Sequence, residues 1–121
     1  MEMKKLPLAL LLTLLSAFFV NAQVVSGNGP GKENYMGYMI KILPTPGNGY
    51  GYDLFFKGRM VVHEPVNPFT MSPLGLSKKV DALKVAHWQI EQFWRTGNHA
   101  IPRRNIRISP DVAGQLKIET R

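Results

Sequence analysis

Residues 50–64, YGYDLFFKGRMVVHE, decide the fold of this chain of 121 residues. Aromatic and aliphatic residues fill two short runs, and the dipeptide Lys57-Gly58 separates them. A two-residue connection with a glycine that accepts a left-handed conformation is typical of a tight β-hairpin. The stretch therefore predicts two antiparallel strands, over residues 50–56 and 59–64.

The hairpin has two faces, and a regular two-residue turn places Phe56 opposite Arg59. The first face then carries Tyr52, Leu54, Phe56, Val61 and His63, and the second carries Asp53, Phe55, Met60, Val62 and Glu64. Both faces are substantially apolar. Because one helix covers only one face, we expect the other to meet the C-terminal segment, the proline-rich loop or a second copy of the chain.

A further strand and one main helix flank the hairpin. Apolar side chains alternate with others over residues 35–43, which predicts a strand. After the prolines of residues 65–75, Ser77 and the periodic run 78–95 predict a helix with Ser77 as its N-cap and its end near Gly97. The helical wheel gathers Val80, Ala82, Leu83, Ala86, Ile90, Phe93 and Trp94 in one arc, opposite Lys78, Lys84, Gln89, Glu91 and Gln92.

The two ends of the mature domain carry weaker signals. Residues 23–34 are rich in Gly and Asn and predict a flexible leader, so the single domain is expected over residues 35–121. Residues 105–108 predict a short strand, and Ser109-Pro110 predicts the start of a short helix. The expected fold is α+β, with a three-stranded antiparallel sheet packed by one main helix and a short C-terminal strand and helix segment.

Residues 1–22 have the three parts of a secretory signal peptide. Lys4 and Lys5 precede an apolar run over residues 6–20, and Ala22 ends the segment with a small side chain. The run is shorter than the roughly 20 residues that span a bilayer, which favours cleavage after Ala22 over a retained anchor. We therefore expect an exported protein, in the periplasm or extracellular, without a membrane span after cleavage.

Composition excludes several classes of function. The chain has no cysteine, which removes disulfides, thiolate nucleophiles and cysteine-based zinc sites. Its length excludes the large barrel scaffolds of many enzymes. Its 15 Lys and Arg outnumber its 8 Asp and Glu, and the resulting net charge of +7 favours an anionic partner.

Short blocks along the chain form a further pattern: Gly51-Tyr52-Asp53-Leu54, Lys57-Gly58, Glu64-Pro65-Val66-Asn67-Pro68, Asp81-Ala82 with Val85-Ala86, and Gly97 followed by Ile101-Pro102. Together they resemble a family of small exported Gram-negative bacterial proteins known as domain of unknown function 4907, over roughly residues 50–116. The chain departs from that pattern at Glu64, where the family prefers Gln, and at Asn67, where it prefers an aliphatic residue. An ionised Glu64 accepts hydrogen bonds but donates none, whereas Gln does both. The resemblance implies export and a compact α+β module, and it brings no catalytic residues.

The sequence predicts no catalytic residues, no metal site and no cofactor. Asp53 and Glu64 could form a carboxylate pair on one sheet face, but their places beside a turn and a proline also explain them. His63, His87 and His99 lack the spacing of a zinc motif.

Four residues are candidates for binding: Trp88, Arg103, Arg104 and Arg107. Trp88 lies on the polar side of the helical wheel, which indicates either packing within the chain or a dimer, or contact with an external ligand. Arginine suits phosphate and carboxylate groups, although a solvated strand edge also explains the cluster. Aromatic residues do not interleave with these arginines, so we expect no nucleic acid partner.

These observations favour a non-catalytic exported module that binds an unknown protein or an anionic partner of the cell envelope, or that forms a homodimer. The alternative is a small periplasmic hydrolase that uses carboxylate and histidine residues. A surface protein that binds anions is a third hypothesis, and its affinity should fall steeply with added salt.

Overall fold

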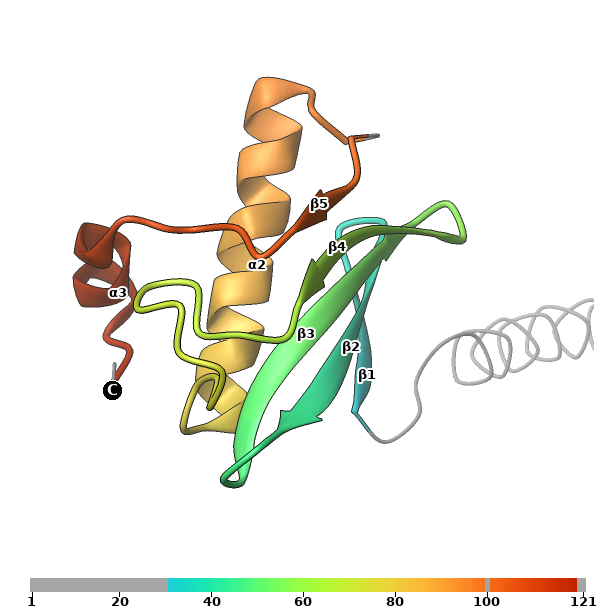
Figure 1. The fold of residues 1–121 in the computed structure, drawn as a ribbon. Coiled ribbons are helices and arrows are strands. Elements are labelled where there is room, and N and C mark those ends of the chain that lie inside the picture. Colours follow the sequence, from blue (N-terminus) through green and yellow to red (C-terminus); the bar gives the residue numbers. More distant parts are fainter. Residues whose placement is uncertain (1–30, 100, 120–121) are drawn as a thin grey trace, which may run out of the picture.

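The computed structural model describes residues 31–99 and 101–119 and shows an α+β fold (Figure 1). The predicted signal peptide and its cleavage site lie outside these residues. One sheet holds the strands in the order β1-β2-β3-β4-β5. The strands are β1 (Lys32–Tyr35), β2 (Tyr38–Thr45), β3 (Gly49–Phe56), β4 (Arg59–Glu64) and β5 (Arg103–Arg104), and the helices are α2 (Lys79–Thr96) and α3 (Pro110–Leu116).

The predicted α+β class with one main helix is confirmed, but the sheet has five strands rather than three. Met36 and Gly37 both have positive φ, at 48° and 85°, and form a tight turn inside the stretch predicted as one strand. Such a turn reverses the chain within two residues, so β1 and β2 pair as an antiparallel hairpin. Because β1 begins at Lys32, the leader predicted through Asn34 extends too far into the domain.

The fifth strand comes from the C-terminal segment. β5 runs parallel to β4, and Arg103 and Arg104 pair with Val62 and His63. The strand predicted over residues 105–108 is therefore wrong in position, since the pairing residues precede it.

A β-bulge in β4 changes the register of the central hairpin. Phe56 pairs with Arg59 as predicted, but Leu54 pairs with Val62 rather than with Val61. Val61 is the extra residue. Because side chains alternate along a strand, this single insertion moves every later side chain of β4 to the opposite face.

The bulge exchanges the positions predicted for His63 and Glu64. Tyr52 pairs with Glu64 and Asp53 pairs with His63. Glu64 therefore faces α2 and is fully buried, while His63 lies beside Asp53 on the other side of the sheet. The hypothesis that Asp53 and Glu64 share one face is wrong.

The face turned away from α2, with Lys41, Asp53 and His63 across its middle, is called the outer face. The pairing register also places Met39, Leu43, Phe55 and Met60 on this face, so apolar and polar side chains are mixed there. α2 and α3 lie on the same side of the sheet, away from this face (Figure 1). The expectation that the C-terminal segment or the proline-rich loop covers this face is wrong, because both pack into the same core as α2.

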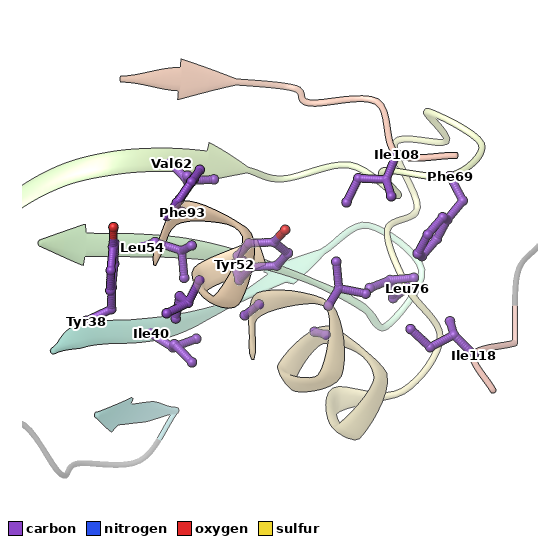
Figure 2. Close-up of a cluster of buried hydrophobic side chains, with 14 of the residues drawn as sticks. Tyr38, Ile40, Tyr52, Leu54, Val62, Phe69, Leu76, Phe93, Ile108 and Ile118 are labelled. Carbon is purple, nitrogen blue, oxygen red and sulfur yellow. The ribbon is translucent and has the colours of Figure 1, made fainter. Parts of the chain in front are cut away.

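The hydrophobic core lies between the sheet and α2 (Figure 2). The buried sheet residues are Tyr38, Ile40, Tyr52, Leu54, Val61 and Val62, and the buried apolar residues of α2 are Ala82, Val85, Ala86, Ile90 and Phe93. The proline-rich loop and the C-terminal segment extend this core with Phe69, Leu76, Ile108, Ala113 and Ile118.

Helix α2 buries a different arc from the one that the wheel predicts. Gln89 is buried, whereas Val80 and Trp94 are 54% and 48% exposed. The hydroxyl of Tyr52 donates a hydrogen bond to Oε1 of Gln89 at 2.6 Å, which offsets the cost of burying the amide. Hydropathy alone assigns glutamine to solvent and misses this pairing.

The ends of the helices agree in part with the sequence. The prediction of Ser77 as N-cap is wrong, because Lys78 occupies that position and makes no side-chain capping bond. Gly97 ends α2 as predicted, with φ of 76° and its N–H donating to the carbonyl of Phe93. Ser109 caps α3 as predicted. In the described part of the chain, no helix is both long and apolar enough to cross a bilayer.

Candidate functional site

A histidine and a buried aspartate form a hydrogen-bonded pair on the outer face. Nδ1 of His63 lies 2.6 Å from Oδ1 of Asp53. The side chain of Asp53 is only 6% exposed, and that of His63 is 38% exposed. A carboxylate accepts at Nδ1, so that nitrogen carries a proton and Nε2 is left for an external group. Among the described residues, Nε2 of His63 has no hydrogen-bond partner.

Basic residues continue this pair across the sheet. Lys41 pairs with Asp53 on one side, and Arg104 pairs with His63 on the other. Lys32 pairs in turn with Lys41 on the edge strand. Directly paired residues share a face, and neighbouring strands lie about 4.8 Å apart. We call the series Lys32, Lys41, Asp53, His63 and Arg104 the outer row.

A small hollow opens at the β5 end of the outer row. Its volume is about 190 Å³, and it is lined by Met60, Val61, Val62, His63, Pro102, Arg103 and Arg104. No carboxylate lines it. The hollow, called the His63 hollow, therefore offers an oriented imidazole beside the side chain of Arg104, a combination that suits an oxyanion.

The structure separates the three predicted arginines. Arg104 is exposed in the outer row. Arg103 points the other way, with its guanidinium carbon 5.5 Å from the centre of the Phe93 ring. Arg107 is exposed beyond β5 and does not line the His63 hollow. Adjacent residues of a strand point to opposite faces, so a cluster in sequence becomes two sites in space.

Trp88, the fourth predicted binding residue, is half-buried and packs against the core. Its neighbour Gln89 is fully inside the fold. This position supports the packing interpretation of Trp88, and a contact with an external ligand stays a prediction.

The sequence singles out Glu64 but does not predict that its side chain is fully buried. Its Oε2 accepts a hydrogen bond of 2.7 Å from the amide of Ile106, and its Oε1 has no partner among the described residues. Burial raises the pKa of Glu64 from 4.5 to about 8, although the bond from Ile106 opposes the shift. Burial also raises the pKa of the neighbouring Tyr52 well above its usual value, and the charge of Glu64 adds to this.

The two other histidines belong to separate contacts between the sheet and α2 or the chain after it. His87 pairs with Glu33 and stacks on Tyr35, with ring centres 3.9 Å apart. Nδ1 of His99 lies 2.6 Å from the hydroxyl of Tyr38. Among residues 31–99 and 101–119, no three His, Asp or Glu side chains are grouped so that they could hold a metal ion.

Comparisons with protein-family models, curated proteins and solved structures give no match. The inference of function therefore depends on the geometry of this chain.

Proposed function

We propose that the chain is an exported, non-catalytic module that binds an anionic partner of the cell envelope. Arg104, His63 and Lys41 of the outer row are the residues that contact this partner. The observation that carries the proposal is the outer row itself, which aligns these basic groups across adjacent strands and ends at the His63 hollow. The net charge of +7 adds long-range attraction for the same class of partner.

Asp53 is compatible with anion binding because its carboxylate is already occupied. The side chain of Asp53 is nearly inaccessible and accepts a hydrogen bond from Nδ1–H of His63. This contact also fixes the direction of the imidazole, so that Nε2 points to a ligand without loss of ring freedom on binding. The buried acid thus positions His63, and the exposed surface of the row stays cationic.

Removing Lys41 and Arg104 together is expected to weaken binding of inorganic polyphosphate about tenfold, since each exposed ion pair contributes up to about 1 kcal/mol. Isothermal titration calorimetry at low salt measures this affinity. The matched control removes Lys79 and Arg95, two exposed cations of α2 outside the outer row. An equal loss in both double alanine variants would mean that only net charge matters.

The dependence of the binding affinity on salt concentration is a second test of the same proposal. The affinity of the unmodified chain for polyphosphate is expected to fall steeply between low and moderate ionic strength, because exposed charges are screened over about 10 Å at 0.1 M. A flat response contradicts contact through the exposed cations of the outer row.

The Asp53–His63 pair favours a hydrolase as the second candidate function. A neutral imidazole held by a carboxylate can take a proton from water at Nε2, as general bases do. The water oxygen then bonds to the phosphorus of a phosphodiester, the ester P–O bond breaks, and the alcoholate leaves towards Arg104 or Lys41. Such an enzyme would use the same basic groups to stabilise the developing charge.

The two functions separate in a hydrolysis assay with bis(p-nitrophenyl) phosphate. For a hydrolase, His63→Gln abolishes release of nitrophenolate and His87→Gln leaves it unchanged, because His87 faces β1 rather than the outer row. For a binding module we expect no release above the buffer rate from any of these proteins. Asp53→Asn should then change polyphosphate affinity only a few-fold.

A further inference from the structure

A second hollow lies along the same edge of the sheet. Its volume is about 170 Å³, and it is lined by Phe56, Lys57, Arg59, Met60, Val61 and Pro102. Met60, Val61 and Pro102 also line the His63 hollow. The two hollows are therefore neighbours that share a wall, and together we call them the β4-edge groove.

Part of β4 has no strand beside it in this groove. β5 pairs only with Val62 and His63. In the described part of the chain, residues 59–61 have β3 on one side and no strand on the other. Figure 1 shows β5 beside one end of β4, with the rest of β4 continuing to the hairpin turn. Backbone groups at an open strand edge can pair with an extended segment from another chain.

Charge and polarity differ along the groove. Lys57 and Arg59 line the hollow near the hairpin turn, and Arg104 is the exposed cation that lines the His63 hollow. Between them, Met60 and Pro102 are common to both hollows and provide an apolar surface. No Asp or Glu lines either hollow. A complementary partner therefore carries acidic groups on both sides of an apolar one.

We infer that the β4-edge groove binds an extended acidic peptide segment with a large apolar side chain that packs on Met60. The segment continues the line of β5 along residues 59–61, and its acidic residues meet the cations at either end of the groove. A peptide fits better than a polyphosphate because only a peptide backbone can complement an open strand edge. This inference rests on the proposed function, since His63 and Arg104 form one end of the groove, and it names the class of the anionic partner.

The test uses two capped peptides that differ in one residue. Each has two glutamates on either side of a central residue, which is leucine in the first and alanine in the second. Calorimetry is expected to show about tenfold tighter binding of the leucine peptide by the unmodified chain, because burial of the larger side chain contributes about 1.5–3 kcal/mol. Equal affinity for the two peptides overturns the inference.

Met60→Asn removes the apolar contact without adding charge. Met60 is 45% exposed, so the variant should fold, and Val80→Asn on α2 is the matched control at a site 54% exposed. Met60→Asn is expected to lose the preference for leucine, while Val80→Asn keeps it. A leucine preference that survives Met60→Asn overturns the inference.

Binding by the β4-edge groove and binding by the outer row give different results in these assays. Binding of polyphosphate that depends on Lys41 and Arg104, with no binding of the leucine peptide, overturns the peptide inference and leaves the proposed function standing. Binding of the leucine peptide that depends on Met60, with polyphosphate binding independent of Lys41 and Arg104, supports the groove and contradicts the proposed role of the outer row.

Discussion

Glu64→Gln is expected to stabilise the folded chain at neutral pH, and the gain should grow as the pH rises from about 5 to about 8. The folded state holds the pKa of Glu64 at about 8, whereas the usual value is 4.5. Between these values the unfolded chain releases the proton that the folded chain retains. Stability therefore decreases with rising pH through this window, by up to about 1.4 kcal/mol per pH unit. A glutamine side chain does not titrate in this range, so the variant does not lose stability in this way.

The pKa of Glu64 is raised because its buried carboxyl group has too few hydrogen-bond donors to stabilise a negative charge. Glu64 is fully buried, accepts one hydrogen bond from the amide of Ile106, and leaves Oε1 without a partner among the described residues. An ionised carboxylate at this site loses its hydration and receives only one donor in return. Glutamine keeps an acceptor for Ile106 and carries no charge.

Urea unfolding of both proteins at intervals from pH 4 to pH 8.5 measures the effect. The two free energies of unfolding should lie close together near pH 4 and differ by on the order of 3–5 kcal/mol near pH 8. Glu119→Gln is the control, because its side chain is 65% exposed and pairs with Lys78 at the surface. Parallel profiles for Glu64→Gln and the unmodified chain would show that Glu64 is ionised in the folded state at neutral pH.

Gly49→Ala is expected to destabilise the fold by about 3 kcal/mol or more. A methyl group on Gly49 would lie 1.8 Å from the carbonyl oxygen of Leu74 and 2.5 Å from Oγ1 of Thr45. Both distances are far below a van der Waals contact, and the carbonyl belongs to the backbone. The start of β3 must therefore separate from residues 74–76, with overpacking strain of about 1–3 kcal/mol.

The separation also breaks hydrogen bonds. Tyr50 and Leu76 exchange two backbone hydrogen bonds of 2.8 Å directly beside Gly49. Each buried bond that is lost costs about 1 kcal/mol or more. This bridge ties the loop before α2 to the sheet, so its loss should lower the cooperativity of unfolding as well as the midpoint.

Gly114→Ala provides a matched control for this effect. Gly114 lies within α3, and a methyl group there would meet no atom within 4 Å. Alanine has the higher helix propensity, so this variant should gain up to about 1 kcal/mol. Thermal unfolding followed by circular dichroism compares the two. A midpoint for Gly49→Ala within a few degrees of the unmodified chain would contradict the close approach of Gly49 to Leu74.

Turns and helix ends that are determined by residues close together in the chain can be predicted from the sequence. The turn at Lys57-Gly58, the end of α2 at Gly97 and the start of α3 at Ser109 all appear where local signals place them. Backbone preferences, capping groups and the helical period act within a few residues, so a single sequence contains them. The excess of Lys and Arg, from which the sequence analysis selects Arg104 as a binding residue, is likewise a property of the composition.

Only the tertiary structure decides which side chains meet. The bulge at Val61 places Glu64 under α2 and His63 on the outer face, a choice that depends on packing against residues far along the chain. Ile106 supplies the hydrogen bond to Glu64, and Arg104 becomes the neighbour of His63 because the C-terminal segment returns to pair with β4. An extra residue in one strand costs little locally, so the alternation of polar and apolar residues does not reveal it, and its position is set by the contacts of the whole fold.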